Sequence, residues 1–133
     1  MIAQIAEGIM TEFSGSALST SVGDRIYRDS AKQNETMPYI VFTVITSENY
    51  DTYNENIEYH HIMFYIWANL TITAYSGLDS LESALRTLFD NTVLTISGWT
   101  NLMMRWVNTR PANSEDDQVI GVMVEYETYI QDT

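Results

Sequence analysis

The sequence predicts an α+β fold with two layers, a mainly antiparallel β-sheet and two α-helices that flank it. Apolar residues recur at helical spacing in two segments, 2–13 and 76–90. Runs of β-branched and aromatic residues fill much of the remaining chain and predict strands. The connections between the long strands suit hairpins, which favours antiparallel pairing with the helices packed on one face. A length of 133 residues suits a single domain spanning residues 1–133.

The first half of the chain is expected to form one helix and two long strands. In the helix, Ile5, Ile9 and Phe13 share one face, and Gly15 marks its end. Pro38 precedes a strand, a position where proline does not interrupt pairing. The expected elements are a helix at 2–13, an extended segment at 25–27, a loop at 29–36, and strands at 39–46 and 57–68.

Residues 47–56, between these strands, have no aliphatic side chain and are too long for a tight turn, so we expect a projecting hairpin arm. The arm is interpreted as a solvated acidic loop, a contact arm or a calcium site. Calcium is disfavoured because the glycine-containing frame of an EF-hand loop is absent. Tyrosines are amphipathic and suit an interface, which favours the contact arm over calcium. The side chains concerned are Glu48, Tyr50, Asp51, Tyr53 and Glu55.

The second half is expected to form one helix and three strands. Leu81 and Leu85 lie on the apolar stripe of the helix. Ser76 is its expected N-cap, and Asp79 is expected in the first turn, where negative charge is favourable. The remaining elements are strands at 93–96, 102–109 and 119–130, a turn at Gly98 and an acidic connection at 111–117.

The composition excludes several classes of function. Six Lys and Arg against 18 Asp and Glu give a net charge of −12, which disfavours gripping nucleic acid or an anionic membrane. Cysteine is absent, which removes disulfides, thiolate chemistry and cysteine-based zinc sites. The first residues lack the basic charges of a secretory signal, and no apolar run approaches the about 18 residues of a membrane span. We therefore expect a soluble intracellular protein with no membrane partner.

No catalytic constellation is visible in the sequence. Dinucleotide, phosphate-loop, metalloprotease and serine-hydrolase motifs are all absent, so we expect no enzymatic activity and no bound metal. His60 and His61 look like a metal site, but adjacent side chains of a strand point to opposite faces. Both histidines are therefore expected to have a structural or surface role.

Two features indicate contacts with other copies of the chain. The strand at 57–68 and the segment 102–107 carry large apolar groups on both faces, and a two-layer fold covers only one of them well. Part of the sheet is therefore expected to be buried against another subunit. Arg25, Arg28 and Lys32 lie close together and apart from most acids. They are either ordinary surface charge or a basic patch that meets an acidic region of a neighbour in a head-to-tail ring.

Several short segments resemble one known family through their order and spacing. They read Val-Gly-Asp-Arg-Ile-Tyr at 22–27, Met-Pro-Tyr-Ile-Val-Phe at 37–42, Phe-Tyr-Ile-Trp-Ala at 64–68, Leu-Thr-Ile-Ser-Gly-Trp at 94–99 and Val-Glu-Tyr-Glu at 124–127. Over nearly its whole length, the chain resembles the tail-completion, or tail-terminator, proteins of long-tailed bacteriophages.

The resemblance implies a structural virion protein of the tail or neck, assembled in the host cytoplasm without cofactors or catalysis. It implies a hexameric ring at the head-proximal end of the tail tube, which ends tube polymerisation and offers the surface that joins the head. The implied partners are other copies of the chain, the major tail tube protein and a head-completion or connector protein. Duplex DNA passes through without specific binding. The alternatives are another neck component, a tube subunit, or a small acidic enzyme or ligand-binding domain with a pocket near His60 or Trp106.

A ring through which DNA passes benefits from an acidic lumen, because carboxylates repel phosphates. The candidates for its lining are Glu48, Asp51, Glu55, Asp116 and Asp117. The candidates for contacts with a neighbouring subunit or the tube are Tyr50, Tyr53, Arg25 and Arg28.

Overall fold

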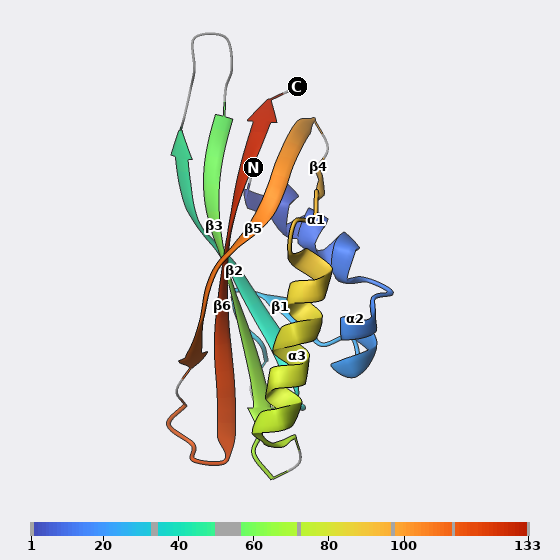
Figure 1. The fold of residues 1–133 in the computed structure, drawn as a ribbon, viewed down its shortest axis with the longest axis vertical. Coiled ribbons are helices and arrows are strands. Elements are labelled where there is room, and N and C mark those ends of the chain that lie inside the picture. Colours follow the sequence, from blue (N-terminus) through green and yellow to red (C-terminus); the bar gives the residue numbers. More distant parts are fainter. Residues whose placement is uncertain are drawn as a thin grey trace.

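A computed structural model describes residues 2–32, 35–49, 57–71, 73–96, 98–112 and 114–132 (Figure 1). The helices of this part are α1 (Ile2–Phe13), α2 (Ala17–Ser21) and α3 (Ala74–Phe89). The strands are β1 (Ile26–Arg28), β2 (Tyr39–Asn49), β3 (Ile57–Asn69), β4 (Thr95–Ile96), β5 (Trp99–Ala112) and β6 (Val119–Asp132). None of the helices among the described residues is long and apolar enough to cross a membrane.

The strands form one six-stranded sheet in the order β1-β2-β3-β6-β5-β4. β1 pairs with β2 in parallel, and the other neighbouring pairs are antiparallel. Strong twist makes β5 cross in front of β6 in Figure 1, and the sheet curls into a half-barrel. The α+β class is confirmed, but the expected two-layer, mainly antiparallel arrangement with two helices is corrected to a mixed, curled sheet with three helices.

The parallel strand arises from the turn that follows α2. Gly23 and Asp24 both have positive φ there, a conformation that glycine adopts at no steric cost. The turn directs β1 along β2, so that the buried Ile26 lies beside the buried Ile40. Local alternation of polar and apolar residues carries no information on this direction, which is why the sequence did not predict it.

All three helices lie on one face of the sheet (Figure 1) and bury it. Phe89 of α3 stacks on Phe64 of β3 with ring centroids 5.0 Å apart. Each large apolar side chain that is fully buried stabilises the fold by roughly 1.5–3 kcal/mol. The largest such residues are Tyr126, Phe42, Phe64, Phe89, Ile5, Ile9, Leu18, Ile40, Ile62, Ile66, Leu85 and Met104.

The helix boundaries differ from the predictions in two places. The Ser/Thr-rich stretch after α1 forms α2, where the side chain of Ser16 caps the helix by accepting from the backbone N–H of Ser19 at 3.1 Å. α3 begins earlier than predicted, at Ala74, so the expectation of Ser76 as N-cap is wrong. Asp79 consequently lies beyond the first turn, which contains no acidic residue.

The strands extend further than the sequence predicts. β2 continues to Asn49, which pairs with Glu58 of β3, so residues 47–49 belong to the sheet and not to the arm. The remainder of the predicted arm, residues 50–56, lies outside the described residues. β5 and β6 pair from Trp99 with Asp132 to Ala112 with Gly121, longer than the predicted 102–109 and 119–130. Polar residues also pair at the ends of these two strands, so a change from apolar to polar residues in the sequence does not mark where a strand ends.

Candidate assembly surface

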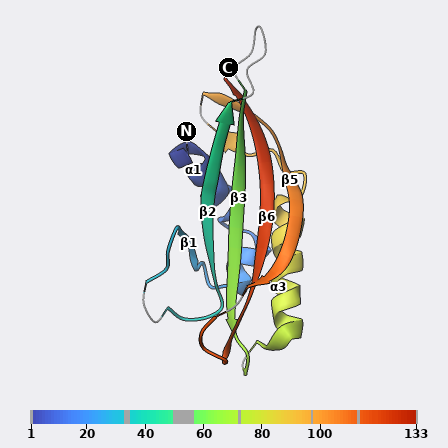
Figure 2. The same ribbon diagram turned by 90° about the vertical axis from the view of Figure 1, so that its left-hand side faces the viewer.

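One face of the sheet faces away from the helices and is called the open face here. It faces the viewer in Figure 2, with the helices behind the strands. Cross-strand pairing aligns the backbones of the residues on this face in level rows, each with one residue from β2, β3, β6 and β5. The rows are Tyr39–Trp67–Gly121–Ala112, Val41–Tyr65–Met123–Arg110, Thr43–Met63–Glu125–Asn108, Thr46–His61–Glu127–Arg105 and Glu48–Tyr59–Tyr129–Met103.

The open face is strongly apolar although no helix covers it. Tyr59, Met63 and Met123 are already buried by their neighbours within the sheet. Met103 and Tyr129, at one end of the face, remain 43% and 37% exposed. Large apolar groups of this kind that stay accessible on a sheet face mark contact surfaces in assembled proteins. The structure therefore places the doubly apolar strand at 57–68 where a neighbour can cover one side of it.

A polar network crosses the middle of the open face. His61 Nδ1 lies 2.9 Å from Glu125 Oε2, and the ring of Tyr59 packs edge-on against His61 at 4.8 Å. The hydroxyl of Tyr59 donates to Glu127, and Arg105 Nη1 reaches the other oxygen of that carboxylate at 3.4 Å. The network holds the acids of β6 in fixed positions, and Arg105 offsets the charge of Glu127.

A hollow of about 320 Å³ lies on the open face beside β1. Its floor and wall come from β2 and β3, and residues 29–31 form its rim. The rings of Tyr65 and Trp67 are parallel to within 5°, with centroids 6.3 Å apart. Trp67 lies against Gly121 of β6, where an added Cβ would approach the indole to 2.5 Å, so glycine is needed for this ring position. Asp29, which has φ 68°, places a carboxylate at the rim.

The predicted basic residues serve their own chain in different ways. Arg25 Nε donates to the carbonyl oxygen of Pro38 at 3.0 Å and so braces the entry to β2. Arg28 Nε lies 3.7 Å from Asp29 Oδ2, an exposed pair that contributes little to stability. Lys32 is exposed in the segment after β1. The three residues remain on one edge of the molecule, but Arg25 is committed to a structural contact.

The predicted acidic residues belong to two connections, which adjoin opposite ends of the paired β3 and β6. Ile57 of β3 pairs with Gln131 and Asn69 pairs with Val119, so the β2–β3 connection and the β5–β6 connection are a whole strand apart. Asp116 and Asp117 are exposed in the β5–β6 connection. Tyr50, Asp51, Tyr53 and Glu55 lie outside the described residues, as does the side chain of Glu48, whose backbone is part of β2.

The two histidines point to opposite faces, as predicted. His60 is fully buried on the helix side, and its Nε2 lies 3.2 Å from Glu58 Oε1, whereas His61 belongs to the open face. Among the described residues, no group of three or more His, Asp or Glu side chains is arranged to hold a metal ion.

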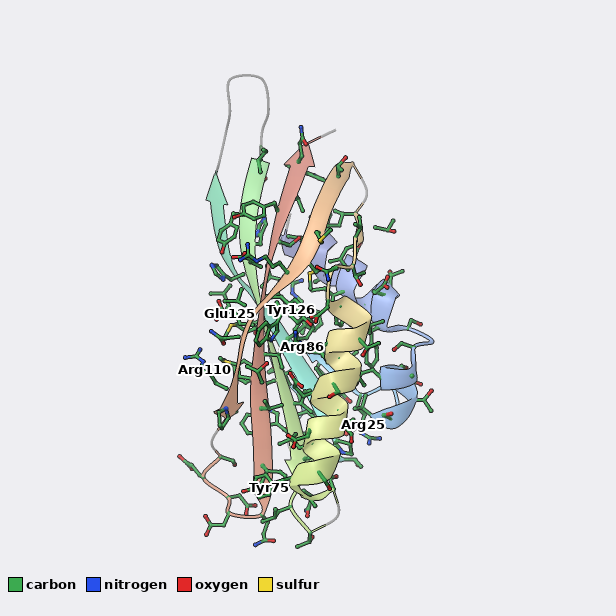
Figure 3. All side chains as sticks on the ribbon, viewed as in Figure 1. Arg25, Tyr75, Arg86, Arg110, Glu125 and Tyr126 are labelled. Carbon is green, nitrogen blue, oxygen red and sulfur yellow. The ribbon has the colours of Figure 1, made fainter. Side chains whose placement is uncertain are left out.

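A second polar network ties α3 to β5 and β6 on the helix side. Arg86 Nη2 donates to Asp90 Oδ2 at 2.9 Å, and Tyr126 donates its hydroxyl hydrogen to the other oxygen of that carboxylate. The guanidinium of Arg86 also lies over the ring of Trp106 at 4.0 Å. Burial, together with the hydrogen bond to Asp90, raises the pKa of Tyr126 far above its usual range. Figure 3 shows Arg86 and Tyr126 pointing toward one another between α3 and β6.

Sequence reasoning pointed to Trp67 through the apolar strand at 57–68, but it did not single out Asp29 at the rim of the hollow or Arg110. Arg110 projects from β5 on the side away from α3 (Figure 3). The available signal in the sequence was the pair of arginines at 105 and 110. The alignment of Arg110 with Tyr65 depends on how β3, β6 and β5 pair with one another, which involves three strands at once.

Comparisons with known proteins agree with this architecture. A family model described as Tail completion protein gp17 matches residues 12–131. A chain in the virion of a native gene transfer agent particle superimposes with a TM-score of 0.74, at 9% identity, over 92% of this chain and 91% of that chain. Another solved structure, which carries no functional description, has a TM-score of 0.58 at 13% identity and covers 96% of both chains. At these identities the two structures show a shared fold. No curated protein sequence matches the chain.

Proposed function

The chain belongs to the family of tail completion protein gp17, and from that premise we propose that it is a tail terminator. Several copies form a ring, hexameric as the family resemblance implies, at the head-proximal end of the tail tube. The ring ends tube polymerisation and provides the surface onto which the head docks. Membership of this family supports a structural role in a phage-type virion, and no catalytic step is part of the proposal.

The observation that carries the proposal is the apolar open face on a sheet whose other face is already covered by helices. Met103 and Tyr129 of this face remain 43% and 37% exposed, and a chain that works alone gains no stability from leaving them accessible. Coverage of this face by neighbouring copies or by the tube removes those groups from water. A ring on a tube end supplies both kinds of neighbour.

The net charge of −12 suits a protein that surrounds a channel through which DNA must pass without adhering. Carboxylates along or around the channel repel phosphates and so prevent DNA from adhering to the wall. We place the acids of the segments 50–56 and 113–118 at the channel or its mouths. A ring structure whose lumen is neutral or basic would contradict this part of the proposal.

Electron microscopy of the purified protein mixed with preformed tail tubes tests the function. A ring at one end of each tube, together with loss of further elongation when tube subunit is added, is the expected result. Incorporation along the whole tube identifies a tube subunit, and binding to portal-bearing heads without tubes identifies a head-closure protein. Either outcome overturns the terminator role. A monomer in solution does not, because the ring forms on its template.

A small ligand-binding domain is the candidate from a different class, because the hollow beside β1 is lined by aromatic side chains. Stoichiometric binding of a small molecule in this hollow, measured by calorimetry, would favour it.

A further inference from the structure

Arg110 and the hollow beside β1 lie at the same level of the sheet but at opposite edges. Val41 pairs with Tyr65, Tyr65 with Met123, and Met123 with Arg110. A second copy that is displaced sideways by the width of the sheet, without a shift along the strands, therefore brings its Arg110 to the hollow of the first. A head-to-tail contact of this kind closes into a ring where the rotation between copies closes, and otherwise generates an open filament.

The hollow has the chemistry that a guanidinium group prefers. Its wall contains the parallel rings of Tyr65 and Trp67, and a planar cation is attracted to aromatic rings. Its rim carries the carboxylate of Asp29, which is 62% exposed. The carboxylate has a partner in Arg28, but that contact is long and exposed and so costs little to exchange.

Arg110 stands out among the five arginines of the chain by its contacts. Arg25, Arg86 and Arg105 each contact an oxygen of their own chain, in Pro38, Asp90 and Glu127 respectively. Arg110 Nη2 instead lies 3.6 Å from the thioether sulfur of Met123, a weak acceptor. Within the described residues no carboxylate pairs with it, and its side chain projects away from the helices (Figure 3).

We propose that Arg110 of one copy enters the aromatic and acidic hollow of the next copy, where it stacks on the rings of Tyr65 and Trp67 and pairs with Asp29. The inference rests on the proposed ring and names a contact that holds it together. The hollow and the arginine lie on different edges, so each copy gives one arginine and receives one. The contact thus repeats around the assembly and leaves no unsatisfied site once the ring closes.

Association between copies tests the contact with matched variants. It is measured by sedimentation equilibrium of the full chain and, on tail tubes, by the protein concentration at which rings form. Arg110→Ala is expected to weaken association about tenfold, the effect of losing a partly desolvated cation–aromatic contact. Arg110→Lys keeps the charge and is expected to recover part of the loss. Arg105→Ala removes the same charge from the same strand, two rows away, and is expected to have a smaller effect. Equal losses for Arg105→Ala and Arg110→Ala would overturn the specific pairing.

Cross-linking locates the contact directly, because the natural chain contains no cysteine. The double variant Ala31→Cys with Ala112→Cys keeps Arg110 and places the second cysteine one row away on the same face of β5. It is oxidised alone and on tail tubes, and each single variant serves as a control. Head-to-tail contact predicts a ladder of cross-linked multimers for the double variant and at most dimers for the single ones. A second double variant, Ala31→Cys with Arg105→Cys, is expected to cross-link less.

The outcomes separate this inference from the proposed function. A ladder without capping of tubes supports the contact and contradicts the terminator role. Capping of tubes by the double variant without a ladder supports the terminator role and overturns the contact. Absence of multimers from the wild-type chain, both alone and on tubes, overturns the contact as well.

Discussion

Replacing Tyr126 by phenylalanine removes one buried hydroxyl and leaves the packing of the ring unchanged. The hydroxyl donates to Asp90, whose other carboxylate oxygen is held by Arg86, so the variant keeps the ion pair and loses a single charge-assisted hydrogen bond. A hydrogen bond to a charged group contributes about 1.5–3 kcal/mol to stability. With an unfolding entropy of about 2.1 cal/mol/K per residue, a loss near 2 kcal/mol lowers Tm by about 7 °C.

The pH dependence of stability gives a second signature of the same hydroxyl. The pKa of Tyr126 in the folded chain is raised above its unfolded value, so the unfolded chain loses this proton first as the pH rises. The stabilisation is complete below about pH 10 and declines above it by about 1.4 kcal/mol per pH unit. Tyr126→Phe lacks this contribution, so the difference in stability between wild type and variant is expected to shrink above pH 10.

Urea denaturation at pH 7 and pH 11, with calorimetry for Tm, measures both effects. Tyr75→Phe is the matched control, because Tyr75 is 64% exposed on the same helix side and the same hydroxyl is removed. The control is expected to stay within about 0.5 kcal/mol of wild type. A Tyr126→Phe variant as stable as wild type at pH 7, or with the same stability difference at pH 11, would refute the reasoning.

Three further predictions concern the open face and its predicted contact residues. Gly121→Ala places a Cβ 2.5 Å from the ring of Trp67 and is expected to destabilise by about 1–3 kcal/mol and to change the near-ultraviolet circular dichroism; an unchanged spectrum would contradict the ring position. Arg25→Ala is expected to lower stability by about 1 kcal/mol in denaturation, through the lost backbone contact, without a specific loss of assembly. Tyr50→Ala with Tyr53→Ala is expected to leave Tm unchanged and to weaken tail joining in a complementation assay, and normal joining would contradict the contact arm.

Much of the fold follows from patterns that are local in the sequence. The apolar stripe of α1, which contains Ile5, Ile9 and Phe13, indicates which side of the helix is buried. The alternation of apolar and polar residues along β6 indicates the buried side of that strand in the same way. Strand ends were less predictable because pairing continues wherever a partner strand continues. The parallel β1 was not predictable, since its direction depends on the positive φ of Gly23 and Asp24 and on the path of α2.

The candidate surface divides in the same way. The two apolar faces of the strand at 57–68 were visible in the sequence, and the structure shows one face on the core and the other open. Clustering of Arg25 and Arg28 indicated a basic patch. Charge counts do not reveal that Arg25 donates a hydrogen bond to the carbonyl oxygen of Pro38 in its own chain. Arg110 and the hollow lie at the same height along the strands because of the registers of three successive strand pairs. These registers cannot be read from any short segment of the sequence.

The placement of the acidic segments restricts how a ring can use its charge. β3 has 13 residues, so its two ends, which adjoin the β2–β3 connection at Ile57 and the β5–β6 connection at Asn69 beside Val119, lie roughly 40 Å apart at about 3.3 Å per residue. If the strands run along the channel, the two ends of β3 lie toward opposite mouths, and the middle of the open face carries the contacts of His61 with Glu125 and of Arg105 with Glu127. If the strands run radially, one segment lies inside and the other outside. Neither orientation joins both segments into one acidic belt, so a ring with both around a single constriction would contradict the register of β3 with β6.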